Sequence, residues 1–249
     1  MTAERVDVLG VGVHAYTWPE LLAQVRAWII AGEPRTVAYA NVHVLNTARR
    51  DAALRTFLDG VDACYCDGSG VILGARLLGA ALPERMTGAD WIWDLAAEAE
   101  SSGWRIHWIG GEPGVTAAAA EQLRTRHPRL TVTTDHGFHA RQGPEDDACL
   151  ERIRAAQPHI VLVGMGTPIQ ERWVAAHREQ MDAPVVWCLG ATADFISGKV
   201  DRPGPAWLVE NHEWLSRLLA DPRRLWQRYL LGNALFMARI ARQRLGRKV

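Results

Sequence analysis

The feature that most constrains this chain is an alternation of short apolar runs with amphipathic runs, repeated at least five times. The apolar runs centre on Val37, Val61, Ile106, Val161 and Val185, and helical periodicity follows each of them. Strands that alternate with helices form a mostly parallel sheet with helices on both faces. We therefore predict an α/β fold with a Rossmann-like sheet, whose strand ends meet at one edge and collect ligands there.

A second unit is predicted at the C-terminus, so that residues 1–202 form the α/β body and residues 203–249 a helical appendage. Pro203-Gly204-Pro205 marks the boundary. No acidic residue follows Asp221 but eight basic ones do, whereas residues 1–221 carry 20 basic against 28 acidic residues. The final helix is expected from Pro222 to about Leu245. A basic amphipathic helix is typical of membrane-surface binding. Nucleic acid is the rival partner, but no stacking motif or nucleic-acid module accompanies the tail, so anionic lipid is preferred.

The sequence gives no sign of export or of a redox or metal role for its cysteines. It lacks both a signal peptide and any run of about 18 uncharged apolar residues, so we expect a cytoplasmic protein. The four cysteines lack metal-ligand spacing and are interpreted as core residues.

Gly10 to Ala15 matches a dinucleotide fingerprint superficially, but Tyr16 to Pro19 separates it from the next helix and no acidic residue ends the next strand. This disfavours an NAD-dependent enzyme.

Asp67 is the candidate general base. It follows a run from Gly60 to Tyr65 that predicts a strand, and it precedes a helical run from Val71 to Leu78. A carboxylate at the carboxyl end of a strand is well placed for proton transfer to a bound ligand, and Gly68 beside it lets backbone approach that ligand. The alternative is that Asp67 only caps the following helix.

Polar side chains also follow two neighbouring runs. Asn41 comes directly after the predicted strand Thr36 to Ala40 and is a candidate substrate contact; the alternative is that it only makes a turn or caps a helix. Arg85 and Thr87 lie in the loop before the next long helix and offer hydrogen-bond donors to an anion. Arg85 has neighbouring acidic residues as alternative partners.

Glycines follow three further predicted strands, at Gly110, Gly166 and Gly190. The helix N-terminus after each is a potential phosphate site, because its backbone N–H groups point outward. The sequence has no Asp-x-Asp pair near a strand end, so no Mg²⁺ site is expected. Asp146 and Asp147 are interpreted as caps of the helix from Pro144 to Ala156.

The run after Gly166 carries its own signals. Thr167 is expected to cap the next helix and Pro168 to take its first position, which places Gln170 and Glu171 in the first turn. The amide and the carboxylate there suit a sugar or a base edge. A well-capped helix with an acidic first turn is the alternative.

Six stretches in this order resemble the WecG/TagA/CpsF family of glycosyltransferases, over about residues 5 to 232. They are Asn41, Cys66 to Gly70, Glu84 to Asp90, Gly164 to Glu171, Gly198 to Arg202 and Glu213 to Leu218. The resemblance implies inverting, metal-independent transfer from a UDP-sugar to a polyprenyl-diphosphate-linked saccharide at the inner face of the cytoplasmic membrane, without a cofactor. Such reactions serve cell-surface polysaccharide synthesis.

The resemblance also implies roles for individual residues. Asp67 would take the proton of the acceptor hydroxyl, and Gln170 would lie in the nucleotide-sugar region. Arg217 and Arg224, with Arg228 one place later than the family spacing, would meet the acceptor diphosphate and the membrane. A non-catalytic membrane-associated nucleotide-sugar-binding protein is the alternative, and the eleven tryptophans are compatible with a homo-oligomer.

The sequence departs from the family pattern at sites near the expected donor. Tyr39 stands where family members carry Thr, and Ile169 stands where they carry Lys. The stretch Gly190 to Asp194 replaces a Gly-Gly-x-Phe-Asp run. From these differences we expect the same reaction class with a different sugar, of the N-acetylmannosamine type, glucose or glucuronate.

Overall fold

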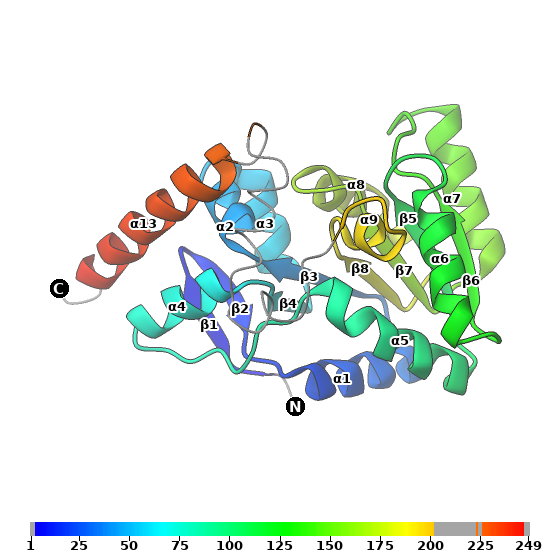
Figure 1. Ribbon diagram of the computed structural model, residues 1–249, viewed down its shortest axis with the longest axis horizontal. Coiled ribbons are helices and arrows are strands. Elements are labelled where there is room, and N and C mark those ends of the chain that lie inside the picture. Colours follow the sequence, from blue (N-terminus) through cyan, green and yellow to red (C-terminus); the bar gives the residue numbers. More distant parts are fainter. Residues whose placement is uncertain (1–2, 202–222, 224–225, 247–249) are drawn as a thin grey trace.

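The computed structural model describes residues 3–201, 223 and 226–246. At its centre lies a six-stranded sheet with the order β4-β3-β8-β7-β5-β6 (Figure 1). Its strands are β3 (Arg35–Ala40), β4 (Ala63–Cys66), β5 (Arg105–Gly110), β6 (Thr131–Asp135), β7 (Ile160–Gly164) and β8 (Val185–Cys188). All five pairings are parallel. This confirms the predicted α/β class, and it brings the carboxyl ends of all six strands to one edge.

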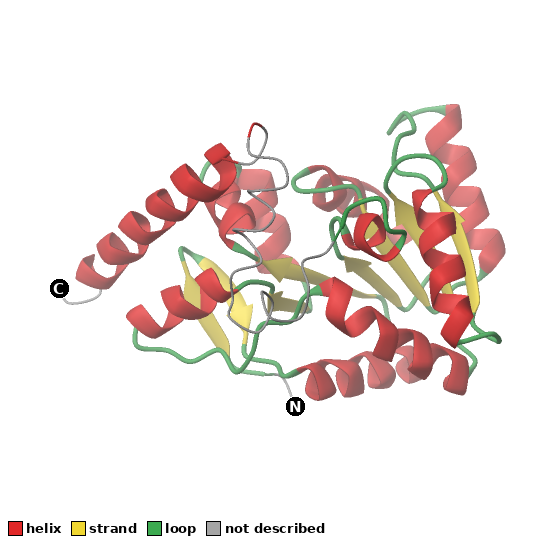
Figure 2. Ribbon diagram, in the orientation of Figure 1, coloured by secondary structure: helices red, strands yellow, loops and turns green. Residues whose placement is uncertain are grey.

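Helices cover both faces of the sheet (Figure 2). One face carries α1 (Trp18–Ala31), α5 (Gly88–Ser102) and α6 (Val115–Arg126), and the other carries α7 (Pro144–Ala156) and α8 (Ile169–His177). Tryptophans join the first layer to the sheet. Trp91 of α5 stacks between Trp18 of α1, at 5.2 Å, and Trp187 of β8, at 4.5 Å between ring centroids. Large aromatic contacts of this kind fix how the helices lie on the strands.

An antiparallel hairpin, β1 (Arg5–Val8) and β2 (Val11–His14), lies beside the edge strand β4. His14 Nδ1 accepts a hydrogen bond of 2.9 Å from the Cys64 N–H, which satisfies a backbone group that an edge strand would otherwise expose. Gly10 lies in the hairpin turn at φ 83°. The Gly10 to Ala15 run therefore builds a hairpin and not a dinucleotide-binding turn, as its sequence context indicated.

The C-terminal region packs onto the body through α13 (Gly232–Gly246), which contacts α2 (Val42–Ala48) and α4 (Ser69–Leu77). Figure 1 shows α13 at the end of the molecule that is opposite β6. Phe236 and Ile240 are each 1% exposed and belong to the main core. A helix from Pro222 to about Leu245 was predicted, and the described residues are helical from Trp226 to Gly246, with a π-helical segment (Gln227–Leu231) directly before α13. Pro222 lies outside the described residues. The boundary predicted at residue 202 lies at the edge of the described residues and stays a prediction.

Several boundaries near the site differ from the predicted ones. Gly60 ends the helix α3 (Ala52–Gly60) and does not open the Asp67 strand, which begins at Ala63. The following helix begins at Ser69, two residues before the expected start. The short elements η1 (Arg178–Gln180) and α9 (Thr192–Ile196) complete the described part of the chain.

The cysteines and the helices agree with two simple expectations. Cys64, Cys66, Cys149 and Cys188 are all reduced and buried, which confirms them as core residues. Among the helices that the structure describes, none is both long and apolar enough to span a membrane.

Candidate active site at the carboxyl edge of the sheet

Asp67 and Asn41 meet at the carboxyl ends of β4 and β3. The Asn41 side chain caps α2 by accepting from the Val44 N–H at 3.0 Å, and its Nδ2 donates to Asp67 Oδ2 at 3.3 Å. The capping role, which was the alternative for Asn41, is therefore confirmed, and its role as a substrate contact stays a prediction. The same side chain also orients the candidate base, because its amide nitrogen is left to donate once its oxygen is engaged by the helix.

Asp67 itself does not cap α4. Gly68 takes the N-cap position, at φ 150°, a backbone conformation that favours glycine. The Asp67 N–H bonds the Ala40 carbonyl at 2.9 Å and the Met86 N–H bonds the Cys66 carbonyl at 2.8 Å, so the backbone on both sides of Asp67 is fixed. Asp67 is partly exposed. A fixed carboxylate with access to solvent is what proton transfer from a bound hydroxyl requires.

A buried polar network lies next to this pair. Gln170 is fully buried, and its Oε1 accepts from the Gly190 N–H at 3.1 Å while its Nε2 donates to Glu171 Oε1 at 2.8 Å. Thr167 Oγ1 donates to the same Glu171 oxygen at 2.8 Å. The Tyr39 hydroxyl lies 3.4 Å from both Gln170 Nε2 and Thr167 Oγ1. The network thus links the ends of the neighbouring strands β3, β8 and β7.

The start of α8 differs from its prediction. Pro168 takes the N-cap position after a cis peptide bond, and no side chain caps the helix. The Thr167 hydroxyl, which was expected to cap, is used by Glu171. Glu171 is 1% exposed, and burial is the main cause that raises the pKa of its carboxyl group. The hydrogen bonds of Gln170 and Glu171 in this structure are made to other groups of the protein, and their assignment as substrate contacts stays a prediction.

Glycines allow three neighbouring strand ends to pack without side chains. A Cβ on Gly110 would lie 2.4 Å from the Gly164 carbonyl oxygen, one on Gly164 would lie 2.5 Å from the Gly190 oxygen, and one on Gly190 would lie 2.7 Å from the Tyr39 hydroxyl. These distances are far below contact distances, so the edge is closely packed from β5 to β3. Gly166, by contrast, has no atom of the described residues within 4 Å of the place where its Cβ would lie. Among Gly110, Gly166 and Gly190, it is the one around which the described residues leave room for a ligand.

Arg85 and Thr87 lead into α5 close to this edge. Thr87 occupies the N-cap position and is buried, and Gly88 packs against Thr192 of α9, since a Cβ there would lie 2.2 Å from Thr192 Oγ1. Arg85 Nη2 pairs with Asp90 Oδ2 at 3.4 Å, as the alternative reading anticipated. The sequence analysis did not identify Thr192 as a residue near the site. Its contact with Gly88 joins two helices that are distant in the chain, and no local sequence pattern predicts it.

The remaining predicted residues fall at the margin of the site or outside the described part. Asp194 of α9 lies 3.8 Å from Lys199 Nζ, which also pairs with Glu112 at 2.8 Å. Arg217 and Arg224 lie outside the described residues. Arg228 belongs to the π-helical segment, and its side chain is likewise outside the described part.

Asp146 is not a helix cap. It is buried, accepts from Trp173 Nε1 at 2.7 Å, and lies 3.2 Å from His139 Nε2 and 3.0 Å from His177 Nε2. The prediction failed because two of these partners, Trp173 and His177, come from α8, which is distant in sequence. Over the described ranges 3–201 and 226–246, no cluster of three or more His, Cys, Asp or Glu could hold a metal ion.

The fold and the site together define an α/β enzyme of the Rossmann-like class, with a carboxylate held at the carboxyl edge of a parallel sheet. The sequence model of the glycosyl transferase WecG/TagA/CpsF family matches residues 6–249. The chain belongs to this family and is a glycosyltransferase.

Similar curated proteins come from Staphylococcus aureus. The proteins of strains NCTC 8325 / PS 47, COL and MRSA252 are each 25% identical over 240 residues, which is 96% of this chain and 92% of theirs. Each is named N-acetylglucosaminyldiphosphoundecaprenol N-acetyl-beta-D-mannosaminyltransferase.

Proposed function

We propose that this chain transfers a sugar from a UDP-sugar to a hydroxyl group of a polyprenyl-diphosphate-linked saccharide, with inversion and without a metal ion. The observation that carries the proposal is the Asp67 carboxylate, fixed by Asn41 at the carboxyl edge of the sheet. The names of the Staphylococcus aureus relatives support a lipid-diphosphate acceptor that carries N-acetylglucosamine.

The proposed reaction is a single displacement. The acceptor oxygen attacks the anomeric carbon, the bond from that carbon to the UDP oxygen breaks, and the hydroxyl proton passes to Asp67. Because attack comes from the face opposite UDP, the anomeric configuration inverts. A positioned general base contributes about 10²–10⁴-fold to such a step.

The departing UDP gains negative charge that the protein has to offset. The N-termini of α6 and α8 face the same edge of the sheet, and their backbone N–H groups and dipoles favour an anion. Arg85 lies in the loop before α5 and precedes Met86, whose N–H bonds the carbonyl of Cys66, the residue before Asp67. These groups support a leaving-group site that uses no metal ion.

A membrane-facing surface at the C-terminal end is part of the proposal. Arg239 of α13 bonds Asn46 of α2, and burial, followed by the nearby guanidinium groups of Arg50, Arg49 and Arg242, lowers its pKa. Basic residues from the C-terminal end of α2 and from α13 are thus neighbours here. Leu230 and Leu231, just before α13, are 51% and 56% exposed. Basic residues beside exposed leucines suit an anionic lipid surface, and this supports peripheral association with the inner face of the cytoplasmic membrane.

A donor panel tests the proposal. The purified protein is offered UDP-ManNAc, UDP-glucose, UDP-glucuronate and UDP-GlcNAc in turn, each with a short-chain polyprenyl-diphosphate N-acetylglucosamine, and UDP release and product mass are measured. We expect release that depends on the acceptor with one donor. Absence of transfer with all four donors, in the presence of detergent or anionic vesicles, would contradict the proposed donor set.

A further inference from the structure

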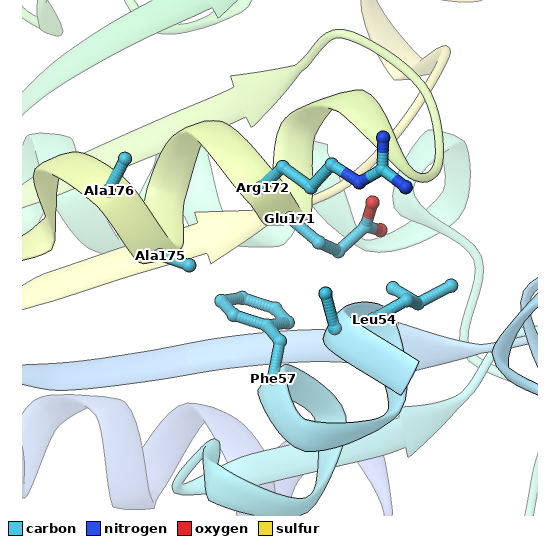
Figure 3. A pocket seen from close by; sticks show the side chains of 7 residues that line it. Leu54, Phe57, Glu171, Arg172, Ala175 and Ala176 are labelled. Atoms are coloured by element: carbon cyan, nitrogen blue, oxygen red, sulfur yellow. The ribbon is translucent and has the colours of Figure 1, made fainter. Parts of the chain in front are cut away.

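Glu171 is an unusual buried residue because its carboxyl group is only half satisfied. Oε1 accepts hydrogen bonds from Thr167 and Gln170, whereas Oε2 has no hydrogen-bond partner among the described residues. The side chain lines a pocket of about 340 Å³ between α3 and α8, together with Leu54 and Phe57 (Figure 3). The rest of this pocket is formed by Ala53, Arg172, Ala175 and Ala176.

Such a group does not serve stability. An unsatisfied buried polar atom such as Oε2 costs free energy, and replacement of a whole set of buried polar partners by apolar groups of similar shape is often neutral or stabilising. The pocket beside Glu171 is mainly apolar, so a leucine at this position would meet suitable neighbours. The presence of a carboxyl group at position 171 is therefore better explained by the two groups that Oε1 holds than by stability.

Through Oε1, one carboxyl group orients two sides of the site. Gln170, which Oε1 holds, accepts a hydrogen bond from the Gly190 N–H at the end of β8. Gln170 and Thr167 both contact the Tyr39 hydroxyl on β3. Tyr39 precedes Asn41 by two residues, and Asn41 holds Asp67. Gly190 and Tyr39 are also in close contact with each other, as the space around Gly190 shows.

We infer that Glu171 is a positioning residue for sugar transfer. It holds the Gln170 amide and the Thr167 hydroxyl in place. These two groups in turn fix the Gly190 turn and the end of β3 from Tyr39 to Asn41, and Asn41 orients Asp67. The inference rests on the proposed function. It assigns Glu171 no contact with substrate. Its effect passes through residues that it fixes, and misplacement of reacting groups by about 1 Å can cost up to about a hundredfold in rate.

Two substitutions separate positioning from mere packing. Glu171→Gln keeps an oxygen acceptor for Thr167 and Gln170, so we expect its kcat to stay within about threefold of wild type. A threefold change in rate corresponds to well under the 1.4 kcal/mol of a tenfold change. Glu171→Leu removes the acceptor but fills the space. We expect it to lower kcat by about 10- to 100-fold. The melting temperature should fall only modestly, because Thr167 and Gln170 lose an acceptor while the cost of the unsatisfied Oε2 is removed.

His107→Leu is the matched control. His107 of β5 is buried, and its Nδ1 lies 2.9 Å from Thr133 Oγ1 of β6, at the far end of the sheet from Asp67. Its substitution also removes a buried side-chain hydrogen bond, and we expect kcat to be unchanged. A wild-type kcat in Glu171→Leu, or equal losses in Glu171→Gln and Glu171→Leu, would overturn the inference.

Amide hydrogen exchange provides a readout that does not need the transferase assay. In Glu171→Leu, Gln170 loses its anchor and the Gly190 amide should exchange faster than in wild type, whereas in Glu171→Gln it should not. Unchanged exchange at Gly190 in Glu171→Leu would overturn the inference even if no donor were active. Should Glu171→Leu not fold, Thr167→Val removes one of the two bonds to Oε1, and wild-type kcat and exchange in that variant would overturn it equally.

Discussion

At the scale of single residues, Glu171 makes the stability of the protein depend on pH. Burial raises the pKa of its carboxyl group in the folded state above the ordinary value of 4.5. The folded protein therefore binds more protons than the unfolded chain between the two pKa values, and the free energy of unfolding falls as pH rises through that interval. The slope from this one group is up to about 1.4 kcal/mol per pH unit.

Glu171→Gln removes this titration and keeps the shape. We expect the stability of the variant, relative to wild type, to increase from pH 4.5 upward and then to level off once the folded-state pKa is passed. Urea unfolding of both proteins between pH 4 and pH 8 measures the difference. A constant difference over this range would show that Glu171 titrates normally in the folded protein.

Some residue roles followed from sequence and others could not. The position of Asn41 after a strand predicted its cap, and the Asp67-Gly68 pair predicted a carboxylate at a strand end, because both depend on local chain order. Glu171 is buried where α3 packs against α8, and Gln170 is buried against Tyr39 of β3 and the Gly190 turn. Asp146 likewise draws its partners from distant segments. Tertiary contacts of this kind leave no periodic signal in one sequence.

At the scale of elements, α13 is docked on the body by a small number of strong contacts. The Phe236 ring packs against Gly74 of α4, where any larger residue would collide with it. Arg239 Nη1 donates to Asn46 Oδ1 at 2.7 Å, and Gln243 bonds both Leu9 and Asp7 of the hairpin. The C-terminal basic helix is therefore part of the same core, a feature that its charge pattern alone did not reveal.

Phe236→Ala should destabilise the protein by about 3–5 kcal/mol, because it removes a fully buried ring and leaves a cavity between α13 and α4. Leu245→Ala on the same helix is the control. That side chain is 65% exposed, and its loss should change stability by less than about 0.5 kcal/mol. Chemical denaturation measures both. Equal, small effects would mean that α13 is not docked as the structure has it.

At the scale of the whole molecule, alternating strands and helices were sufficient to predict the sheet, its parallel strands and the edge where the site lies. The order of the strands in the sheet was not predictable from the sequence. It depends on the direction in which each connection crosses the sheet, and these crossings place β5 and β6 on one side of β7 and β8, β3 and β4 on the other. The run from Val6 to Val13 indicates a strand or the edge of a hairpin, but not that this hairpin lies beside β4. Its role in covering the edge strand needs the His14 contact with Cys64.

The charge distribution over the whole molecule gives a prediction for membrane binding. Arg50 belongs to the basic group at the junction of α2 and α13, and Arg50→Glu should weaken binding to anionic vesicles by about 10- to 30-fold, since each arginine near such a surface contributes about 1 kcal/mol. Arg129→Glu changes an exposed arginine just before β6, at the opposite end of the sheet, and should have little effect. Vesicle sedimentation at low salt compares the two variants. Equal losses would indicate a general charge effect without a preferred face.

The measurement that tests the central claim most directly compares the acceptor-dependent rate of wild type with that of Asp67→Asn, with the donor that the panel identifies. The amide keeps the shape of Asp67 and still accepts from Asn41, but it cannot take a proton at neutral pH. We expect kcat to fall by about 10²–10⁴-fold with little change in melting temperature. Asp59→Asn, an exposed change on α3, should behave as wild type. Transfer by Asp67→Asn at a rate near that of wild type would show that another group takes the proton.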